Sequence, residues 1–314
     1  MPSQAEIRES ITADLIALLK KGTKPWQRPW SSDPACCGLP RSISTGRAYS
    51  GINVLILEAA AMARGFQSKT WGTYQAFAKA GGQVRRRPAE YKPGTWGVQI
   101  VYYSCVERAK KDDNGDEKIE RFPLLRTYTV FNLDQVDGAA LDHLRPGRVE
   151  AAEVVPDYAH AEAVFEATQA EVRFGGDRAF YKRPYGSEFP NHTGGDYIQM
   201  PLRKQFHTPA DFMTTWGHEL CHWSECRLGW KGSYSMGELV AEIGACYLAG
   251  HLGLPIGEHL ESHAAYLACW LKELESDNKA IFKAAAQASK AVDLILSYSR
   301  SEAPEPEAVL AGQD

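Results

Sequence analysis

The sequence predicts an α+β protein with two domains, and three observations lead to that class. The chain has 314 residues, whereas a single hydrophobic core stops growing at about 250–300 residues. Strand-like runs gather in the first half, and long runs with helical spacing dominate the second half. The net charge also changes sign between the halves. We therefore expect a mixed α/β domain over residues 1–145, a mainly helical domain with a small sheet over residues 156–300, and a disordered tail over residues 301–314.

The charge difference between the two halves is large. Residues 1–150 contain 22 Lys and Arg against 16 Asp and Glu, a net charge of +6. Residues 151–314 contain 13 and 23, a net charge of −10. A basic half is typical of a chain that meets a polyanion there, although two domains can also differ in charge by chance.

The N-terminal half mixes helices and strands. Helical spacing of apolar residues, with glycines behind each run, predicts helices over residues 6–21, 52–64 and 70–80. β-branched and aromatic residues predict strands over residues 98–106 and 125–133. The polar stretch 110–121, which contains Asn114-Gly115, predicts a solvated hairpin loop between these strands.

The C-terminal half follows an aperiodic linker over residues 140–156. It is expected to begin with a helix over residues 158–174 and two short strands over residues 179–184 and 196–201. Thr208-Pro209 fits an N-cap followed by proline at the first helical position, and it predicts a helix over residues 210–228. Residues 236–251 are predicted to form another helix, and residues 255–298 are predicted to be largely helical.

Several classes of protein are disfavoured. No apolar run approaches the roughly 20 residues that span a bilayer, so no membrane association is expected. The N-terminus carries Glu6, Glu9 and Asp14 and lacks the continuous apolar region of a secretory signal. Seven cysteines without a regular framework argue against a disulfide scaffold. A cytoplasmic location is the simplest expectation.

The run His218-Glu219-Leu220-Cys221-His222, inside the predicted helix 210–228, carries the strongest chemical signal. Two histidines four residues apart share one face of a helix and can bind one Zn²⁺ ion through neutral imidazoles. Glu219, next to the first histidine, can then act as general base toward a zinc-bound water. The alternative is a pair of exposed histidines on an amphipathic helix.

A catalytic zinc ion requires a third protein ligand, and the run Glu238-Leu-Val-Ala-Glu242 supplies two candidates on one helical face. A glutamate from a second helix is the thermolysin arrangement, in which a further carboxylate four residues later orients a ligand histidine. This comparison makes Glu238 the zinc ligand and Glu242 its outer partner. The reverse assignment remains open. The surrounding apolar residues predict a mostly buried helix, where carboxylates need partners.

Tyr197 is a candidate for a substrate cleft. It lies in the predicted strand 196–201, and metallopeptidases of this type commonly hold an extended peptide along an edge strand. A simple packing role for Tyr197 is equally consistent with the sequence.

The basic half is rich in aromatic residues, a combination typical of single-stranded nucleic-acid binding because aromatic rings stack on bases while cations follow the phosphates. The alternative is that many of these aromatics belong to the core. No duplex-reading motif and no phosphate-binding loop is found. The candidates for DNA contacts are Lys24, Trp26, Arg28, Trp30, Arg47, Tyr49, Trp71, Arg85, Arg86 and Arg87.

Both halves together resemble the ArdC-type antirestriction proteins of conjugative plasmids, over about residues 5–300. The N-terminal half is similar to the single-stranded-DNA-binding domain that these proteins share with TraC-type primases. The runs that carry the resemblance are Lys24-Pro-Trp-Gln-Arg-Pro-Trp30, Gly46-Arg-Ala-Tyr-Ser-Gly-Ile-Asn53, Trp71-Gly-Thr-Tyr-Gln-Ala-Phe77, Gly81-Gly-Gln-Val84, Val130-Phe-Asn-Leu-Asp-Gln-Val136, Asp196-Tyr-Ile-Gln-Met-Pro201, Trp216-Gly-His-Glu-Leu-Cys-His-Trp223 and Glu238-Leu-Val-Ala-Glu-Ile-Gly-Ala245.

The resemblance implies a function as well as a fold. It implies a protein that binds single-stranded DNA and shields incoming plasmid DNA from host restriction, with a zinc-binding, zincin-like metallopeptidase domain of the gluzincin type. It also adds Asn53 to the candidate DNA contacts. The sequence departs from the family pattern around residues 85–95. Two alternatives stay open, a metalloprotease that cuts proteins bound to single-stranded DNA and a DNA-binding module whose zinc is structural.

Overall fold

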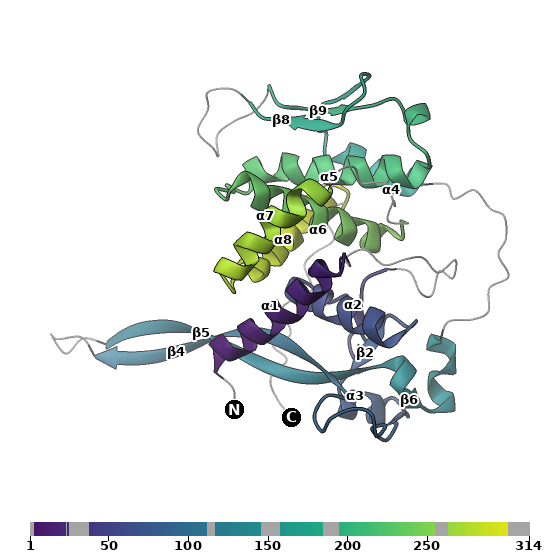
Figure 1. The fold of residues 1–314 in the computed structure, drawn as a ribbon, viewed down its shortest axis with the longest axis vertical. Helices are drawn as coiled ribbons and strands as arrows, with labels where there is room; N and C mark the ends of the chain where they lie inside the picture. Colours follow the sequence, from purple (N-terminus) through teal and green to yellow (C-terminus); the bar gives the residue numbers. More distant parts are fainter. Residues whose placement is uncertain are drawn as a thin grey trace.

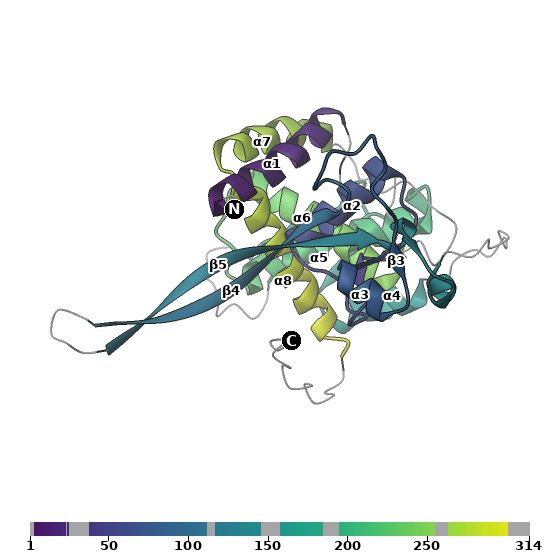
Figure 2. The ribbon, with the colours of Figure 1, turned by 90° about the horizontal axis from the view of Figure 1, so that it is seen from below.

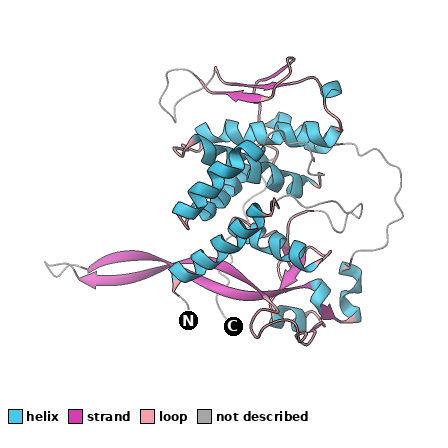
Figure 3. Ribbon diagram, viewed as in Figure 1, coloured by secondary structure: helices cyan, strands magenta, loops and turns pink. Residues whose placement is uncertain are grey.

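The computed structural model describes residues 3–22, 24, 38–111, 117–145, 158–184, 195–254 and 263–300. A layer of helices lies between two groups of strands (Figure 1). Figure 3 shows the same arrangement with helices in cyan and strands in magenta. The predicted α+β class is therefore confirmed. The tail over residues 301–314 and most of the expected linker lie outside the described residues.

The N-terminal half is built on a four-stranded sheet with the order β1-β2-β5-β4. β1 (Arg41–Ser42) pairs in parallel with β2 (Thr70–Gly72), and β2 pairs antiparallel with β5 (Glu117–Asn132). β5 in turn pairs antiparallel with β4 (Val98–Lys111). Beside this sheet lie α3 (Tyr74–Lys79) and a two-stranded ribbon of β3 (Gln83–Val84) and β6 (Val136–Asp137).

The strands β4 and β5 form a long hairpin that projects beyond the rest of the molecule in two perpendicular views (Figures 1 and 2). Their register runs without interruption from Val98 opposite Val130 to Lys111 opposite Glu117. The predicted loop over residues 110–121 is therefore wrong at both ends, where the chain is still strand. Backbone pairing does not require apolar side chains, so a polar composition alone does not mark a loop.

The N-terminal half contributes two long helices, of which the second packs against β4. α1 (Gln4–Lys20) begins at a capping box in which Ser3 and Glu6 satisfy each other's backbone N–H groups. α2 (Ile52–Arg64) ends at Gly65, whose φ of 68° is the left-handed conformation that glycine adopts without strain. Both helices agree closely with the predictions because their start and stop signals are local.

The helices of the C-terminal half pack around α5 (Pro209–Arg227) and α6 (Tyr234–Leu252). The other helices of this half are α4 (Ala159–Ala167), α7 (His263–Ser276) and α8 (Ala280–Ser297). A three-stranded sheet with the order β7-β9-β8 covers the side of α5 that faces away from α6 and α8 (Figure 1). Its strands are β7 (Val172–Phe174), β9 (Tyr197–Met200) and β8 (Phe180–Lys182).

Two predicted helices are partly wrong. The expected helix over residues 70–80 begins only at Tyr74, because residues 70–72 form β2 between β1 and β5 and Thr73 caps the helix behind them. The expected helix over residues 158–174 ends at Ala167. Gln169 then adopts a positive φ of 54°, and the chain turns into β7 beside β9. In both places pairing with distant strands outweighs the local helical spacing.

The two halves share one hydrophobic core. Leu15, Leu19 and Leu55 from the first half belong to the same buried cluster as the apolar faces of α5, α6 and α8. Hydrogen bonds also cross this interface. The Tyr247 hydroxyl donates to the Gly51 carbonyl at 2.9 Å, and the Gly51 N–H donates to Ser289 Oγ at 2.9 Å. The N-terminal half therefore holds one side of the helical bundle directly.

Candidate metal centre

α5 carries the His-Glu-x-x-His run and starts at a well-formed cap. The Thr208 side chain accepts from the Asp211 N–H, the Asp211 carboxylate accepts from the Thr208 N–H, and Pro209 occupies the first turn. His218 and His222 lie one turn apart on this helix, and their rings have centroids 4.8 Å apart. The predicted helical setting of the motif is therefore confirmed.

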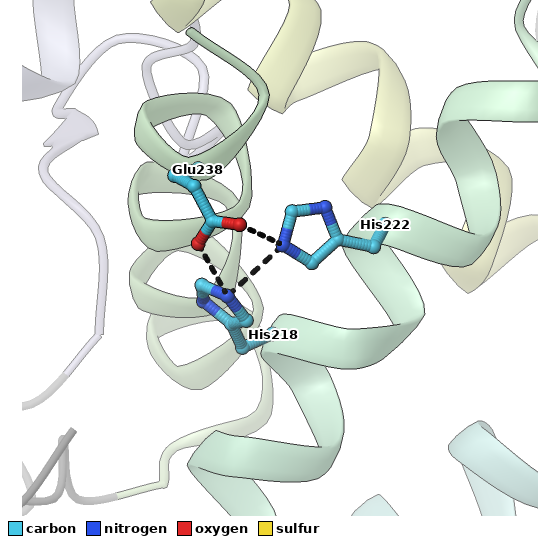
Figure 4. Close-up of side chains that lie close together, drawn as sticks. All are labelled: His218, His222 and Glu238. Carbon is cyan, nitrogen blue, oxygen red and sulfur yellow. Dashed lines mark hydrogen bonds and ion pairs between the residues drawn. The ribbon is translucent and has the colours of Figure 1, made fainter. Parts of the chain in front are cut away.

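α6 approaches α5 closely enough to bring a carboxylate to the two imidazoles. Gly244 permits this approach, because a Cβ atom at that position would lie 2.6 Å from Cys221 Sγ on α5. Ser233 caps the start of α6. Glu238, in the second turn, then faces both histidines, as Figure 4 shows.

The three side chains place their donor atoms around one position. The Nε2 atoms of His218 and His222 are 3.1 Å apart. Glu238 Oε2 lies 3.7 Å from His218 Nε2, and Glu238 Oε1 lies 3.6 Å from His222 Nε2. Ligands bound tetrahedrally at about 2.0–2.1 Å from one cation lie roughly 3.3 Å from each other. The separations therefore fit a divalent metal, and these residues form the one such cluster found in the described part of the chain.

The electrostatics of the cluster also suit a cation. Burial by itself lowers the pKa of His222, but hydrogen bonds with Glu225 and Glu238 outweigh burial and raise the pKa to about 10. Burial raises the pKa of Glu238, yet its contacts with His218 and His222 hold that pKa well below its usual range. The carboxylate is thus ionised and directed at the two imidazoles. Metal binding at such a cluster displaces a proton.

Glu219 lies beside the metal position and is 6% exposed. Burial raises the pKa of this carboxyl, and the neighbouring His218 and His222 partly counteract the rise. The backbone N–H of Tyr181 on β8 donates to the Glu219 carboxylate. A glutamate with a raised pKa next to a metal-binding pair is suited to accept and return a proton.

The second glutamate of α6, Glu242, lies one turn beyond Glu238 and has a different contact. It is fully buried, and its Oε1 is 3.1 Å from Lys24 Nζ. The carboxylate on the outer side of His222 is instead Glu225, whose Oε1 lies 2.9 Å from His222 Nδ1. The predictions did not include Glu225, although its position three residues after His222 on the same helix is a signal that could have identified it.

The side chain of Tyr197 lies on the face of its sheet that is directed away from α5. Tyr197 lies on β9, the central strand, where Ile198 and Met200 are fully buried and alternate with the half-buried Tyr197. Its ring is covered by the Arg173 guanidinium, 3.7 Å from the ring centroid. Because side chains alternate between the faces of a strand, Tyr197 is directed to the outer face of the sheet. The strand at the sheet edge beside Glu219 is β8.

The predicted DNA contacts occupy several kinds of position. Trp71 is 1% exposed and belongs to the core. The side-chain amide of Asn53 donates to the Val101 carbonyl and accepts from the Val101 N–H, so it holds β4. Tyr49 is half-buried, and Lys24 is bound to Glu242. The exposed candidates are Arg47, Arg85, Arg86 and Arg87. Trp26, Arg28 and Trp30 lie outside the described residues.

The fold and the site together define a class of protein. A His-Glu-x-x-His helix whose metal position is completed by a glutamate of the following helix is the arrangement of zincin-like metallopeptidase domains. Residues 159–287 match the family model of a zincin-like metallopeptidase. Residues 5–131 match the N-terminal domain of the anti-restriction factor ArdC. No helix within the described ranges has the length and hydropathy needed to cross a membrane.

Relatives that span both halves identify the family. The chain is 34% identical to the antirestriction ArdC protein from plasmid R388, whose metal-free crystal structure superposes with a TM-score of 0.72 over 94% of this chain and 98% of that one. The Mn(II)-bound structure of the same protein gives 0.69 over 93% and 97%. The chain thus belongs to the ArdC family of antirestriction proteins.

A longer relative shares this region as well. The DNA primase TraC of Escherichia coli is 35% identical over 95% of this chain, but the match covers only 28% of that primase. The chain therefore spans about a quarter of the length of this relative. The zincin-like domain has a divalent-metal site, and the solved relative binds Mn(II).

Proposed function

We propose that this protein binds single-stranded DNA through residues 1–145 and protects incoming plasmid DNA from host restriction, with a zinc-dependent peptide-hydrolysing site in residues 156–300. The observation that carries the DNA part is an exposed surface on the β4–β5 hairpin, which we call the hairpin aromatic surface. It consists of Tyr102, Arg126 and Tyr128. Membership of the ArdC family and the basic character of the first half agree with this function.

The hairpin aromatic surface has the chemistry that single-stranded DNA requires. Tyr102 is 58% exposed and Tyr128 is 44% exposed, and their ring centroids lie 6.4 Å apart. Arg126, also exposed, is paired directly across the hairpin from Tyr102 and therefore lies on the same face. Exposed rings provide stacking platforms for bases, and a neighbouring cation contacts the phosphates. Of the aromatic residues favoured by the sequence that the structure describes, Trp71 is buried and Tyr49 is half-buried, so neither offers a comparably exposed ring.

Replacing Tyr102 and Tyr128 together with alanine is expected to weaken binding of a labelled oligothymidylate by at least about 10-fold, since each stacked base contributes about 1–3 kcal/mol. Fluorescence anisotropy at two salt concentrations measures this change. Tyr234→Ala is the matched control, because Tyr234 is 71% exposed in the other half of the chain. Unchanged affinity in the double variant, or equal affinity of the native protein for duplex DNA, would contradict the stacking model.

The metal site supports the hydrolytic part of the proposal. Zn²⁺ bound by His218, His222 and Glu238 would supply an activated water and polarise a peptide carbonyl. Glu219 takes the proton from the attacking water and returns it to the leaving amine. β8 lies at the edge of its sheet and touches Glu219 through the Tyr181 N–H. An extended peptide paired along β8 would therefore pass beside Glu219.

A second candidate function is a metalloprotease that cleaves proteins on single-stranded DNA. The shared hydrophobic core favours it, because it joins the DNA-binding half rigidly to the half that carries the metal position. A DNA-bound protein would then be presented to the site at a fixed distance from the strand.

Glu219→Gln distinguishes the two functions. The variant is expected to keep its metal, because Glu219 is not a ligand, and to lose about 10²–10⁴-fold in peptide hydrolysis, the usual contribution of a general base. Metal content and cleavage of a single-stranded-DNA-binding protein on DNA measure these effects. If Glu219→Gln still protects plasmid DNA on transfer into a restricting host, antirestriction depends on DNA binding. If protection disappears with hydrolysis, the protease function is the correct one.

A further inference from the structure

We propose that Glu225 is a positioning residue for the metal centre. Its carboxylate holds the imidazole of His222 so that Nε2 faces the metal position, and Arg183, the residue directly after β8, holds Glu225. This inference rests on the proposed metal site. Glu225 and Arg183 are not metal ligands themselves, and the sequence alone identified neither of them.

The contacts of Glu225 are specific. Glu225 is 2% exposed, and its Oε1 lies 2.9 Å from Nδ1 of His222, three residues earlier on α5. Its other oxygen, Oε2, accepts a hydrogen bond and forms an ion pair with the Arg183 guanidinium. Both carboxylate oxygens of this buried side chain therefore have a partner. Oε1 binds the ligand histidine His222, and Oε2 binds Arg183.

The hydrogen bond from His222 selects one form of its ring. A carboxylate can only accept, so Nδ1 of His222 must carry the proton that Glu225 binds. In the neutral imidazole, Nε2 is then left with its lone pair directed at Glu238 and His218, where a metal ligand is needed. A carboxylate on the outer nitrogen also increases the basicity of the inner nitrogen and fixes the ring orientation.

The packing around Glu225 leaves a defined space for its carboxylate. A Cβ atom at Gly237 on α6 would lie 2.9 Å from Glu225 Oε1, the same oxygen that binds His222. Gly237 stands one residue before the ligand Glu238, so the absence of a side chain lets α6 approach this oxygen. The glycine, the carboxylate and the two ligands are therefore packed as one unit.

Arg183 connects this unit to the strand at the sheet edge. It follows directly after β8 (Phe180–Lys182), whose Tyr181 N–H binds the Glu219 carboxylate. β8 thus reaches Glu219 through Tyr181, and the residue directly after the strand, Arg183, reaches Glu225. Since the Arg183 side chain is 57% exposed, its contribution is partly screened by solvent, and we expect it to be smaller than that of Glu225.

The experiment measures Zn²⁺ and Co²⁺ affinity of the full chain by competition with a chromophoric chelator. Glu225→Ala is expected to bind metal about 10–100-fold more weakly, the usual effect of losing an outer-shell partner of a ligand histidine. Glu225→Gln, which can still accept from Nδ1–H but has no charge, is expected to fall between Glu225→Ala and the native protein. Arg183→Met is expected to weaken binding by a few-fold, and less as salt is raised.

A matched control separates positioning from simple stability. Asp196 is another largely buried carboxylate, and it accepts from Arg227 and from the Tyr181 hydroxyl at 2.8 Å each. It lies between α5 and the same sheet but binds no ligand histidine. Asp196→Asn should therefore keep the native metal affinity even if it lowers the melting temperature, whereas both Glu225 variants should lose affinity.

A spectroscopic readout completes the test. Long-range ¹H–¹⁵N spectra of the zinc-loaded protein should show His222 protonated at Nδ1, and the visible spectrum of the cobalt form should change in Glu225→Gln. Native metal affinity in Glu225→Gln and Glu225→Ala would overturn the proposal while leaving the metal site intact. If the native protein binds neither cation, the proposed metal site itself fails. A melting curve recorded without metal shows whether each variant is folded.

Discussion

Glu238→Gln is expected to reduce metal affinity by more than about 100-fold, whereas Glu242→Gln is expected to leave it nearly unchanged. Only Glu238 has carboxylate oxygens within 3.7 Å of both ligand imidazoles. Losing a ligand should cost more than the roughly 10–100-fold that follows loss of an outer partner. Glu242 lies one turn further along α6, and its Oε1 is bound to Lys24 at 3.1 Å.

The two glutamates are matched controls for each other, since they lie on the same helix and undergo the same chemical change. Isothermal titration with Zn²⁺ and with Mn²⁺ measures both variants and also shows which cation the site prefers. The opposite result, in which Glu242→Gln loses the metal and Glu238→Gln retains it, would restore the reverse assignment that the sequence left open.

Lys24→Met is expected to lower the free energy of unfolding by about 3 kcal/mol, because removing one partner of a buried ion pair leaves the other charge poorly compensated. The side chain of Glu242 is 0% exposed and that of Lys24 is 18% exposed. The double variant Lys24→Met, Glu242→Leu is expected to recover most of this loss, since it removes both charges from an apolar setting. Urea denaturation followed by fluorescence measures the changes.

Lys20→Met provides the control for this experiment. Lys20 pairs with Glu275 at 2.6 Å, but both side chains are at least half exposed. Exposed pairs of this kind contribute about 0–1 kcal/mol, so the control should be close to native stability. The sequence favoured DNA contact for Lys24. If Lys24→Met weakens oligonucleotide binding without changing the free energy of unfolding, the DNA role is correct and the structural role is wrong.

The sequence predictions succeeded where the signal lies within a few residues of the element, and they failed where the element depends on distant partners. The Ile52–Arg64 helix and the start of α5 agree with the structure because caps, glycine stops and apolar spacing act within a few residues. β2 and β7 were missed because each is strand only through partners far away in the chain. Local spacing carries no information about such partners.

The metal site likewise has one part that local sequence predicts and another that depends on distant contacts. His218, Glu219 and His222 follow from the geometry of one helix, and the structure brings Glu238 to them from the next. The spacing of Glu225 from His222 is visible in the sequence, but the close approach of Gly237 and the contact with Arg183 after β8 are not. Composition favoured Trp71 as a DNA contact, and family resemblance favoured Asn53. In the structure Trp71 is buried in the core, and the Asn53 side chain is hydrogen-bonded to the backbone of β4.

The shared core of the two halves has a consequence for how such a protein can be divided. Leu15, Leu19 and Leu55 are at most 3% exposed and belong to the cluster that includes α6 and α8. A truncation between residues 145 and 158 would leave these side chains facing water on the first fragment and their partners facing water on the second. Large exposed apolar patches promote aggregation. We therefore expect the two halves together to be the smallest stable unit, and recombination to preserve function best when it exchanges both together.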